Sequence, residues 1–247
     1  GKKPVFTLVA MGGMGKTSLT WYWLQNDLDL STLDGLLWWS FDSGEAAFPH
    51  FLAEAISYAS NQSIDPADLS FHDQVQTLIN LLRKRSFLIV LDSFERQLRA
   101  YAGMDPTYRP DLATRESRDA RACVDPFAAQ FLSRMASDPT AAKLLVTTRL
   151  MIQDLEDSTG DPLHGCRKER LTPLSPDDAV AFVRSQGVTK GTDAEIKAAC
   201  ESYGYHPLSL RILSGLIRRD KKQPGDISAT KRYQEHTDLV RSHDSIL

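Results

Sequence analysis

Short apolar runs alternate along this chain with longer segments in which apolar residues recur at helical spacing. The runs at residues 5–10, 36–41, 87–91 and 144–146 have the length and composition of strands, and the continuous apolar runs at 87–91 and 144–146 are typical of buried strands. We predict a further strand at residues 170–174. Each of these runs is too short to be a helix, so the first interpretation of the pattern is a sheet.

Apolar residues spaced three and four positions apart predict helices between the runs. After the first run, this spacing predicts a helix whose inner face carries Leu19, Tyr22 and Trp23. The pair Asp125-Pro126 is typical of the N-cap and first turn of another helix. Strands that alternate with helices in this way predict an α/β fold, with a parallel sheet of about five strands between two helical layers.

The alternation stops after Leu174, where helix signals follow one another without strands between them. Thr192 and Glu195 have the spacing of a capping box, and Pro207 is placed to begin another helix. We therefore predict an α/β domain, a small helical domain, and a linker or the start of a following domain, at residues 1–173, 174–220 and 221–247.

One segment shows neither the short apolar runs of strands nor the three-and-four spacing of helices. Residues 97–123 are rich in Arg, Asp and Pro, and the segment is too long for an ordinary connection. We predict an insertion or a mobile loop there.

Composition excludes several classes of function. Lys and Arg total 29 against 32 Asp and Glu, so the net charge of −3 argues against a broad grip on nucleic acid or an anionic membrane. No apolar run approaches the ~18 residues of a membrane helix. Cys123, Cys166 and Cys200 are far apart and odd in number, which predicts reduced core thiols and a cytoplasmic protein. The chain begins without methionine, and we expect it to be a fragment of a larger protein.

The strongest chemical signal is the segment A-M-G-G-M-G-K-T at residues 10–17. Apart from Ala10 it matches G-x-x-x-x-G-K-[ST], the phosphate-binding loop, and it stands between a predicted strand and a predicted helix. Such a loop turns its backbone N–H groups toward an anion, and the helix adds its positive N-terminal end. We expect ATP or ADP to bind here, with contacts from Gly12, Gly13, Met14, Gly15, Lys16, Thr17 and Ser18.

Two of these residues have particular roles in the expected site. The Lys16 ammonium is expected to contact the β- and γ-phosphates, and the Thr17 hydroxyl to ligate Mg²⁺. Asp92 ends the most apolar strand, and the carboxyl end of a parallel strand faces the ligand crevice, so we expect Asp92 to complete the Mg²⁺ site. A water-activating acid usually follows such an aspartate. Here Ser93 follows it, and Glu95 is either that acid or a solvated charge.

A third strand end delivers Thr147, Thr148 and Arg149 to the same edge. The planar guanidinium of arginine makes two parallel hydrogen bonds to a phosphate. We therefore expect Arg149 to sense the γ-phosphate. The alternative is a surface arginine that merely follows an edge turn.

In this order, these motifs resemble the nucleotide-binding module of the STAND NTPases, in particular the NB-ARC type found in plant immune receptors, apoptosis scaffolds and bacterial regulators and defence proteins. The resemblance covers residues 5–218 and includes G-Y-H-P-L at residues 204–208. It implies that Pro207 packs on the adenine of ADP and that exchange of ADP for ATP favours an open, oligomerising state. It also implies slow Mg²⁺-dependent ATP hydrolysis, because Ser93 replaces the second acid, and effector and sensor domains elsewhere in the chain.

Two other classes remain open. One is a P-loop kinase of a small molecule, for which the Arg-containing segment 97–121 would be a lid. The other is a DNA-handling ATPase or transcription regulator of the AAA+ kind, although the net charge argues against direct nucleic-acid contact by this segment. A GTPase is disfavoured because the base-reading pattern N/T-K-x-D is not found.

Overall fold

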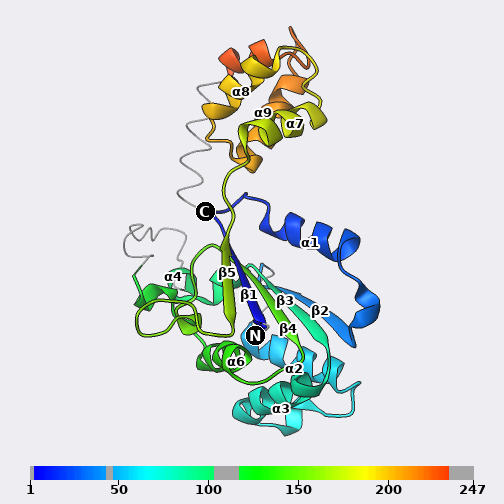
Figure 1. The fold of residues 1–247 in the computed structure, drawn as a ribbon, viewed down its shortest axis with the longest axis vertical. Coiled ribbons are helices and arrows are strands. Elements are labelled where there is room, and N and C mark those ends of the chain that lie inside the picture. The colour runs from blue at the N-terminus through cyan, green and yellow to red at the C-terminus, as the bar shows by residue number, and fades with distance from the viewer. Residues whose placement is uncertain (1–2, 43–46, 103–116, 234–247) are drawn as a thin grey trace. The chain divides into compact units, whose positions relative to one another are not determined.

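A parallel five-stranded sheet organises the first part of the chain (Figure 1). The structure is a computed structural model and describes residues 3–42, 47–102 and 117–233. The strand order is β2-β3-β4-β1-β5, and every neighbouring pair is parallel. This arrangement confirms the predicted α/β class. The strands are β1 (Val5–Val9), β2 (Gly35–Ser40), β3 (Phe87–Asp92), β4 (Lys143–Thr148) and β5 (Cys166–Arg170).

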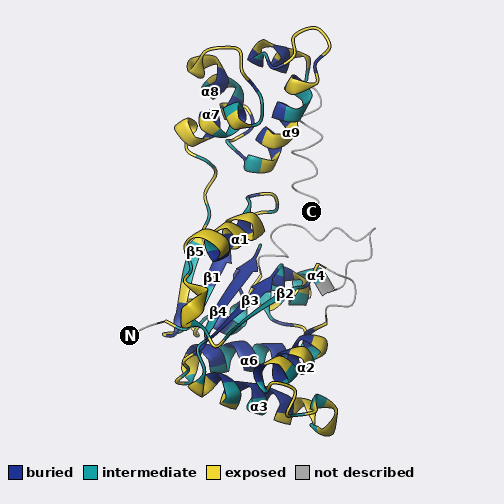
Figure 2. Cartoon of the chain, turned by 90° about the vertical axis from the view of Figure 1, so that its right-hand side faces the viewer, coloured by how far each residue is buried: buried dark blue, intermediate teal, exposed yellow. Residues whose placement is uncertain are grey.

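Helices cover both faces of the sheet, with α2, α3 and α6 on one face and α1 on the other (Figure 2). Alternate residues of β3 make this visible, because Ile89 joins the core under α2, α3 and α6, whereas Val90 packs with Leu24 of α1. The helices of this part are α1 (Lys16–Asn26), α2 (Phe48–Ala59), α3 (Phe71–Lys84), α4 (Arg99–Ala102) and α6 (Pro126–Ser137).

The predicted inner face of α1 is right for Trp23, which is partly buried against the core between α1 and the sheet, and wrong for the other two residues. Leu19 and Tyr22 are 47% and 60% exposed, and Thr20 and Leu24 are buried instead. Apolar residues occur all around this helix, so their spacing does not single out one side. Trp21, also exposed, packs edge-on against Trp38 of β2, with 5.7 Å between ring centroids.

The predicted position of the last strand is also wrong. β5 covers Cys166–Arg170, whereas residues 171–174 are outside any strand. β5 lies at the edge of the sheet and pairs only with β1, so only one side of it is protected from water. Such a strand keeps charged residues such as Arg167 and Glu169, and an apolar run is therefore the wrong signal for it.

The second part of the chain is helical and has its own core. α7 (Pro176–Ser185), α8 (Asp193–Glu201) and α9 (Pro207–Arg218) pack around a set of buried residues that includes Val183, Ile196 and Leu213. The capping box of Thr192 and Glu195 begins α8 as predicted. A 3-10 helix, Ile227–Arg232, follows α9 and contributes Ile227 to the same core.

The chain divides into two compact units. One comprises Gly1–Val9 and Thr17–Arg170, and the other comprises Ala10–Lys16 and Leu171–Leu247. The phosphate-loop segment therefore belongs with the helical unit. The three-domain division from the sequence, with its boundary near residue 173, stays a prediction.

The ends of the predicted insertion 97–123 are paired with each other. Leu98 and Cys123 form an antiparallel bridge, and the Val124 N–H donates to the Gln97 carbonyl over 2.9 Å. Residues 103–116 of this segment lie outside the described residues.

The three cysteines are free and buried, which confirms the prediction of core thiols. Burial raises the pKa of the Cys200 thiol to about 11 and also raises the pKa of Cys123 and Cys166. Within the described ranges, no helix combines the length and the apolar character that crossing a bilayer requires.

Candidate functional site

The centre of the candidate site is the carboxylate of Asp92, the last residue of β3, which is almost fully buried. The Thr17 hydroxyl, in the first turn of α1, donates to Asp92 Oδ1 and Oδ2 over 2.9 and 3.1 Å. The Thr147 hydroxyl on neighbouring β4 donates to Asp92 Oδ1 over 2.6 Å. Asp92 and Thr147 come together because the carboxyl ends of β3 and β4 share one edge of the sheet, and Thr17 contacts Asp92 from the first turn of α1.

The Thr17 hydroxyl and the Asp92 carboxylate suit Mg²⁺, which prefers hard oxygen ligands. Among the described residues, no group of three or more His, Cys, Asp or Glu side chains is placed to hold a metal ion. Thr17 and Asp92 would be the protein ligands of a magnesium ion here, with water and phosphate oxygens in its other positions, as is usual in nucleotide sites.

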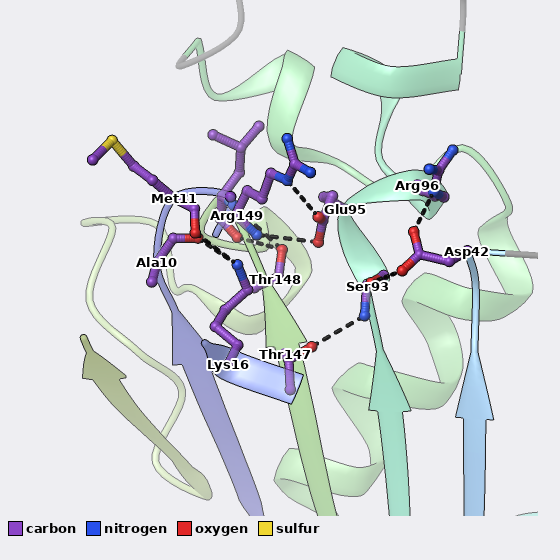
Figure 3. Close-up of polar contacts among 12 residues, drawn as sticks. Ala10, Met11, Lys16, Asp42, Ser93, Glu95, Arg96, Thr147, Thr148 and Arg149 are labelled. Atoms are coloured by element: carbon purple, nitrogen blue, oxygen red, sulfur yellow. Dashed lines mark hydrogen bonds and ion pairs between the residues drawn. The ribbon is translucent and has the colours of Figure 1, made fainter. Parts of the chain in front are cut away.

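The phosphate-loop segment, Ala10–Lys16, folds around its own lysine. Lys16 Nζ donates to the Ala10 and Met11 carbonyls over 2.7 and 3.1 Å, and the side chain is 9% exposed (Figure 3). Gly13 and Gly15 have φ values of +72° and +88°, which only glycine adopts without strain. Ala10 is not among the described residues with a left-handed φ, so alanine costs no backbone strain at that position.

The loop packs on the N-terminal end of α9 within the second unit. His206 is the N-cap of α9, and its Nδ1 accepts from the Ser209 N–H over 3.4 Å. Since Nδ1 accepts, Nε2 carries the proton and donates to the Gly12 carbonyl over 3.0 Å. The sequence gives no signal for this role of His206. Pro207, the predicted adenine contact, is the next residue and begins α9.

Gly13→Ala is expected to destabilise the protein more than Gly15→Ala. Both positions have a left-handed φ, which costs a residue with a Cβ about 1–2 kcal/mol. A Cβ on Gly13 would also lie 2.7 Å from Leu208 Cβ, whereas nothing lies within 4 Å of a Cβ on Gly15. Urea unfolding of the two variants measures the difference, with Gly15→Ala as the matched control. Equal losses would show that contact between the loop and α9 contributes nothing to stability.

Glu95 and Arg149, which follow the carboxyl ends of β3 and β4, form an ion pair. Arg149 Nε lies 2.9 Å from Glu95 Oε1, and the Arg149 backbone N–H donates to Glu95 Oε2 over 3.2 Å (Figure 3). Glu95 is 5% exposed, so the interpretation of Glu95 as a solvated charge is wrong. Arg149, predicted as the phosphate sensor, is positioned by this carboxylate.

Arg149→Ala is expected to lower the free energy of unfolding by about 1–3 kcal/mol, because it leaves the buried Glu95 carboxylate without its cation. Glu95→Gln is expected to cost less, since Arg149 is partly exposed and reaches water. The double variant Arg149→Ala/Glu95→Gln should recover most of the loss, because no buried charge remains. Denaturant unfolding of the three variants checks this order. A double variant as unstable as the sum of the two single variants would contradict the assignment of the cost to a buried charge.

A second acid approaches the same edge from β2. The Ser93 hydroxyl donates to Asp42 Oδ2 over 2.7 Å, and Arg96 Nε lies 2.8 Å from Asp42 Oδ1 (Figure 3). Burial by itself raises the pKa of Asp42, but hydrogen bonds from Ser93 and Arg96 and the charges of Arg96 and Arg149 outweigh it and hold this pKa below its usual range. Asp42 was not selected from the sequence. The feature that could have identified it is its position just after β2, the strand that pairs with β3.

The solved structures that resemble this chain include two archaeal ATPases. A Walker-type ATPase of Pyrococcus abyssi matches with a TM-score of 0.58 and 16% identity, over 97% of this chain and 69% of that chain. A STAND protein (signal transduction ATPase with numerous domains) with a tetratricopeptide-repeat sensor, from Pyrococcus horikoshii, matches with a TM-score of 0.55 and 15% identity, over 96% of this chain and 30% of that chain. The chain therefore has the fold of the P-loop ATPases.

Comparison of the sequence with protein-family models and with curated proteins gives one similar protein to report. No protein-family model matches the chain. An uncharacterized WD repeat-containing protein of Nostoc sp. (strain PCC 7120) is 26% identical over 219 residues, which are 87% of this chain and 16% of that protein. The chain thus spans only a small part of the length of this curated relative.

Proposed function

We propose that this chain is the ADP- and ATP-binding switch module of a STAND-type signalling, defence or regulatory protein, close to the NB-ARC type. The observation that carries the proposal is the contact of the Thr17 hydroxyl with both oxygens of the buried Asp92 carboxylate. A phosphate-loop lysine immediately precedes that threonine. The STAND protein among the structural neighbours supports the choice of class.

Each proposed site residue has a separate task. The backbone N–H groups of residues 12–18 and the Lys16 ammonium bind phosphate oxygens. Thr17 and Asp92 hold Mg²⁺, which when bound neutralises charge on the phosphates. Arg149 binds the γ-phosphate, so ATP has a contact that ADP lacks. A ligand shifts a two-state equilibrium only by its differential affinity, and this contact supplies a difference.

The proposed lever is the packing of the loop on α9. Because Gly12 bonds to His206, and Pro207 follows His206, a nucleotide in the loop lies next to the start of that helix. Pro207 then packs on the adenine, and ADP stabilises a closed state. Exchange for ATP favours an open state that self-associates, with slow hydrolysis as the return step. Effector and sensor domains in the same chain and a cytoplasmic location complete the proposal.

Direct measurement of bound nucleotide tests the proposal. The purified protein is denatured, and the released nucleotide is identified by chromatography. The emptied protein is titrated with MgADP and with a non-hydrolysable MgATP analogue, and its mass in solution is measured with each. Micromolar or tighter binding, and a larger assembly with the ATP analogue alone, are expected. A protein that retains no nucleotide and binds neither would overturn the proposal.

Intermediate results separate the alternatives. Nucleotide binding without any change in the mass of the assembly would contradict the switch function and leave a simple ATPase. Turnover stimulated many-fold by DNA would favour a DNA-handling ATPase or regulator. Stimulation by a small-molecule acceptor, with transfer of phosphate to it, would favour a kinase.

A further inference from the structure

The position after Asp92 lacks the acid that ATP hydrolysis needs. Ser93 occupies it, and Glu95, the next acid in the sequence, has both oxygens engaged by Arg149. Glu95 is also buried. A carboxylate that is enclosed and held in a buried ion pair is poorly placed to reach a water molecule.

Asp42 is held beside this position. The Phe41 N–H donates to the Asp92 carbonyl over 3.0 Å, which continues the pairing of β2 with β3 past the end of β2. The Phe41 ring packs edge-on against buried Phe94, with 5.5 Å between centroids. These two contacts fix the backbone on either side of Ser93, and Ser93 donates to the Asp42 carboxylate.

A continuous chain of hydrogen bonds connects the two aspartates, and Figure 3 shows the part of it that runs from Thr147 through Ser93 to Asp42. Thr147 donates to Asp92 over 2.6 Å, the Ser93 N–H donates to Thr147 Oγ1 over 3.0 Å, and the Ser93 hydroxyl donates to Asp42 over 2.7 Å. Ser93 makes both of its bonds from a left-handed backbone, with φ +58° and ψ +40°. Non-glycine residues in this region are uncommon and concentrate at functional sites.

A contribution to folding stability does not explain why an aspartate is held at position 42. Its side chain is 57% exposed and that of Arg96 is 56% exposed, and ion pairs this open to water contribute little to folding. Both Asp42 oxygens accept a hydrogen bond, from Arg96 and from Ser93, but the exposed carboxylate keeps further lone pairs open to water, whereas Glu95 is enclosed.

We propose that Asp42 is the acid that orients and deprotonates the attacking water, in place of the missing residue after Asp92, with Ser93 as its positioning residue. The proposal rests on the proposed ATP-binding function. A lone pair of the water oxygen forms the new bond to the γ-phosphorus, and the water proton passes to the Asp42 carboxylate and then to solvent. The bond from the γ-phosphorus to the bridging oxygen breaks with its electron pair remaining on ADP, which leaves ADP and inorganic phosphate.

Asp42→Asn tests the assignment, with Asp27→Asn, an exposed aspartate after α1, as the matched control. Single-turnover hydrolysis of MgATP should fall roughly 100-fold or more in Asp42→Asn and stay unchanged in Asp27→Asn. The affinity for the non-hydrolysable MgATP analogue should change less than about threefold in both, because Asp42 contributes to the reaction and not to binding. Ser93→Gly, which removes the hydroxyl without straining the backbone, should lose rate to a smaller extent.

A second measurement does not depend on activity. The carboxyl pKa of Asp42, followed by NMR in nucleotide-free protein, should lie below its usual range and rise toward it in Ser93→Gly. Unchanged hydrolysis in Asp42→Asn would overturn the assignment, as would a wild-type protein that binds ATP without hydrolysing it. Both results leave nucleotide binding standing. Only a wild-type protein that binds neither nucleotide would overturn the proposed function as well.

Discussion

Lys16→Ala is expected to weaken the binding of ADP and ATP by at least about 100-fold, equivalent to roughly 3 kcal/mol, because it removes a charge-assisted contact to phosphate. In the structure this ammonium is held by the Ala10 and Met11 carbonyls, with little exposure. It is therefore already inside the loop, and the variant loses a placed charge. Calorimetric titration with MgADP and with the ATP analogue measures the effect.

The control for this variant is Lys84→Ala, which removes an exposed lysine from the last turn of α3. The control separates a local effect from a general loss of positive charge. Folding is checked by the unfolding midpoint, since Lys16 also bonds within its loop. A folded Lys16→Ala protein with wild-type affinity would show that the loop does not bind phosphate.

Asp92→Asn is expected to abolish the effect of Mg²⁺ on ATP affinity and to slow hydrolysis by about 100-fold or more. Asparagine keeps the shape of the side chain and one acceptor oxygen, but it replaces the other oxygen with a donor that faces the Thr17 hydroxyl. The metal then loses its charged protein ligand, while Lys16 is untouched. ADP binding without metal should therefore persist.

Titrations with and without Mg²⁺ make this test. Wild-type protein should bind ATP more tightly with the metal, and Asp92→Asn should bind equally in both conditions. A variant that keeps the metal dependence would place the magnesium site elsewhere. Asp27→Asn again provides the matched control.

The central strands could be predicted because they are buried on both faces. β3 and β4 are enclosed by helices on either side, and each therefore leaves an uninterrupted apolar run in the sequence. β5 is exposed along one edge and carries charged residues, so no apolar run marks its position. α1 has apolar residues on several sides, so their spacing does not identify its buried face. The hydrophobic pattern therefore identifies two kinds of element reliably. One is a strand that is buried on both faces, and the other is a helix whose apolar residues all lie on a single buried face.

The candidate site divides in the same way. Lys16, Thr17 and Asp92 can be selected because each is defined by its immediate neighbours in sequence, although their roles remain predictions. The contacts of Glu95 with Arg149 and of Asp42 with Ser93 join residues that are more than fifty positions apart. No local pattern encodes such partners, since the strand order of the sheet brings them together.

The edge-on pair of Trp21 and Trp38 has a practical consequence. All of the tryptophans, at positions 21, 23, 38 and 39, lie in α1 or β2, so the helical unit contains none. Tryptophan fluorescence, excited where tyrosine does not absorb, is therefore a label-free optical probe of two elements only: the helix that begins with Lys16 and Thr17, and the strand that leads to Asp42. An emission change on adding MgATP would report on those two elements, while melting of the helical unit would need a different signal, such as circular dichroism.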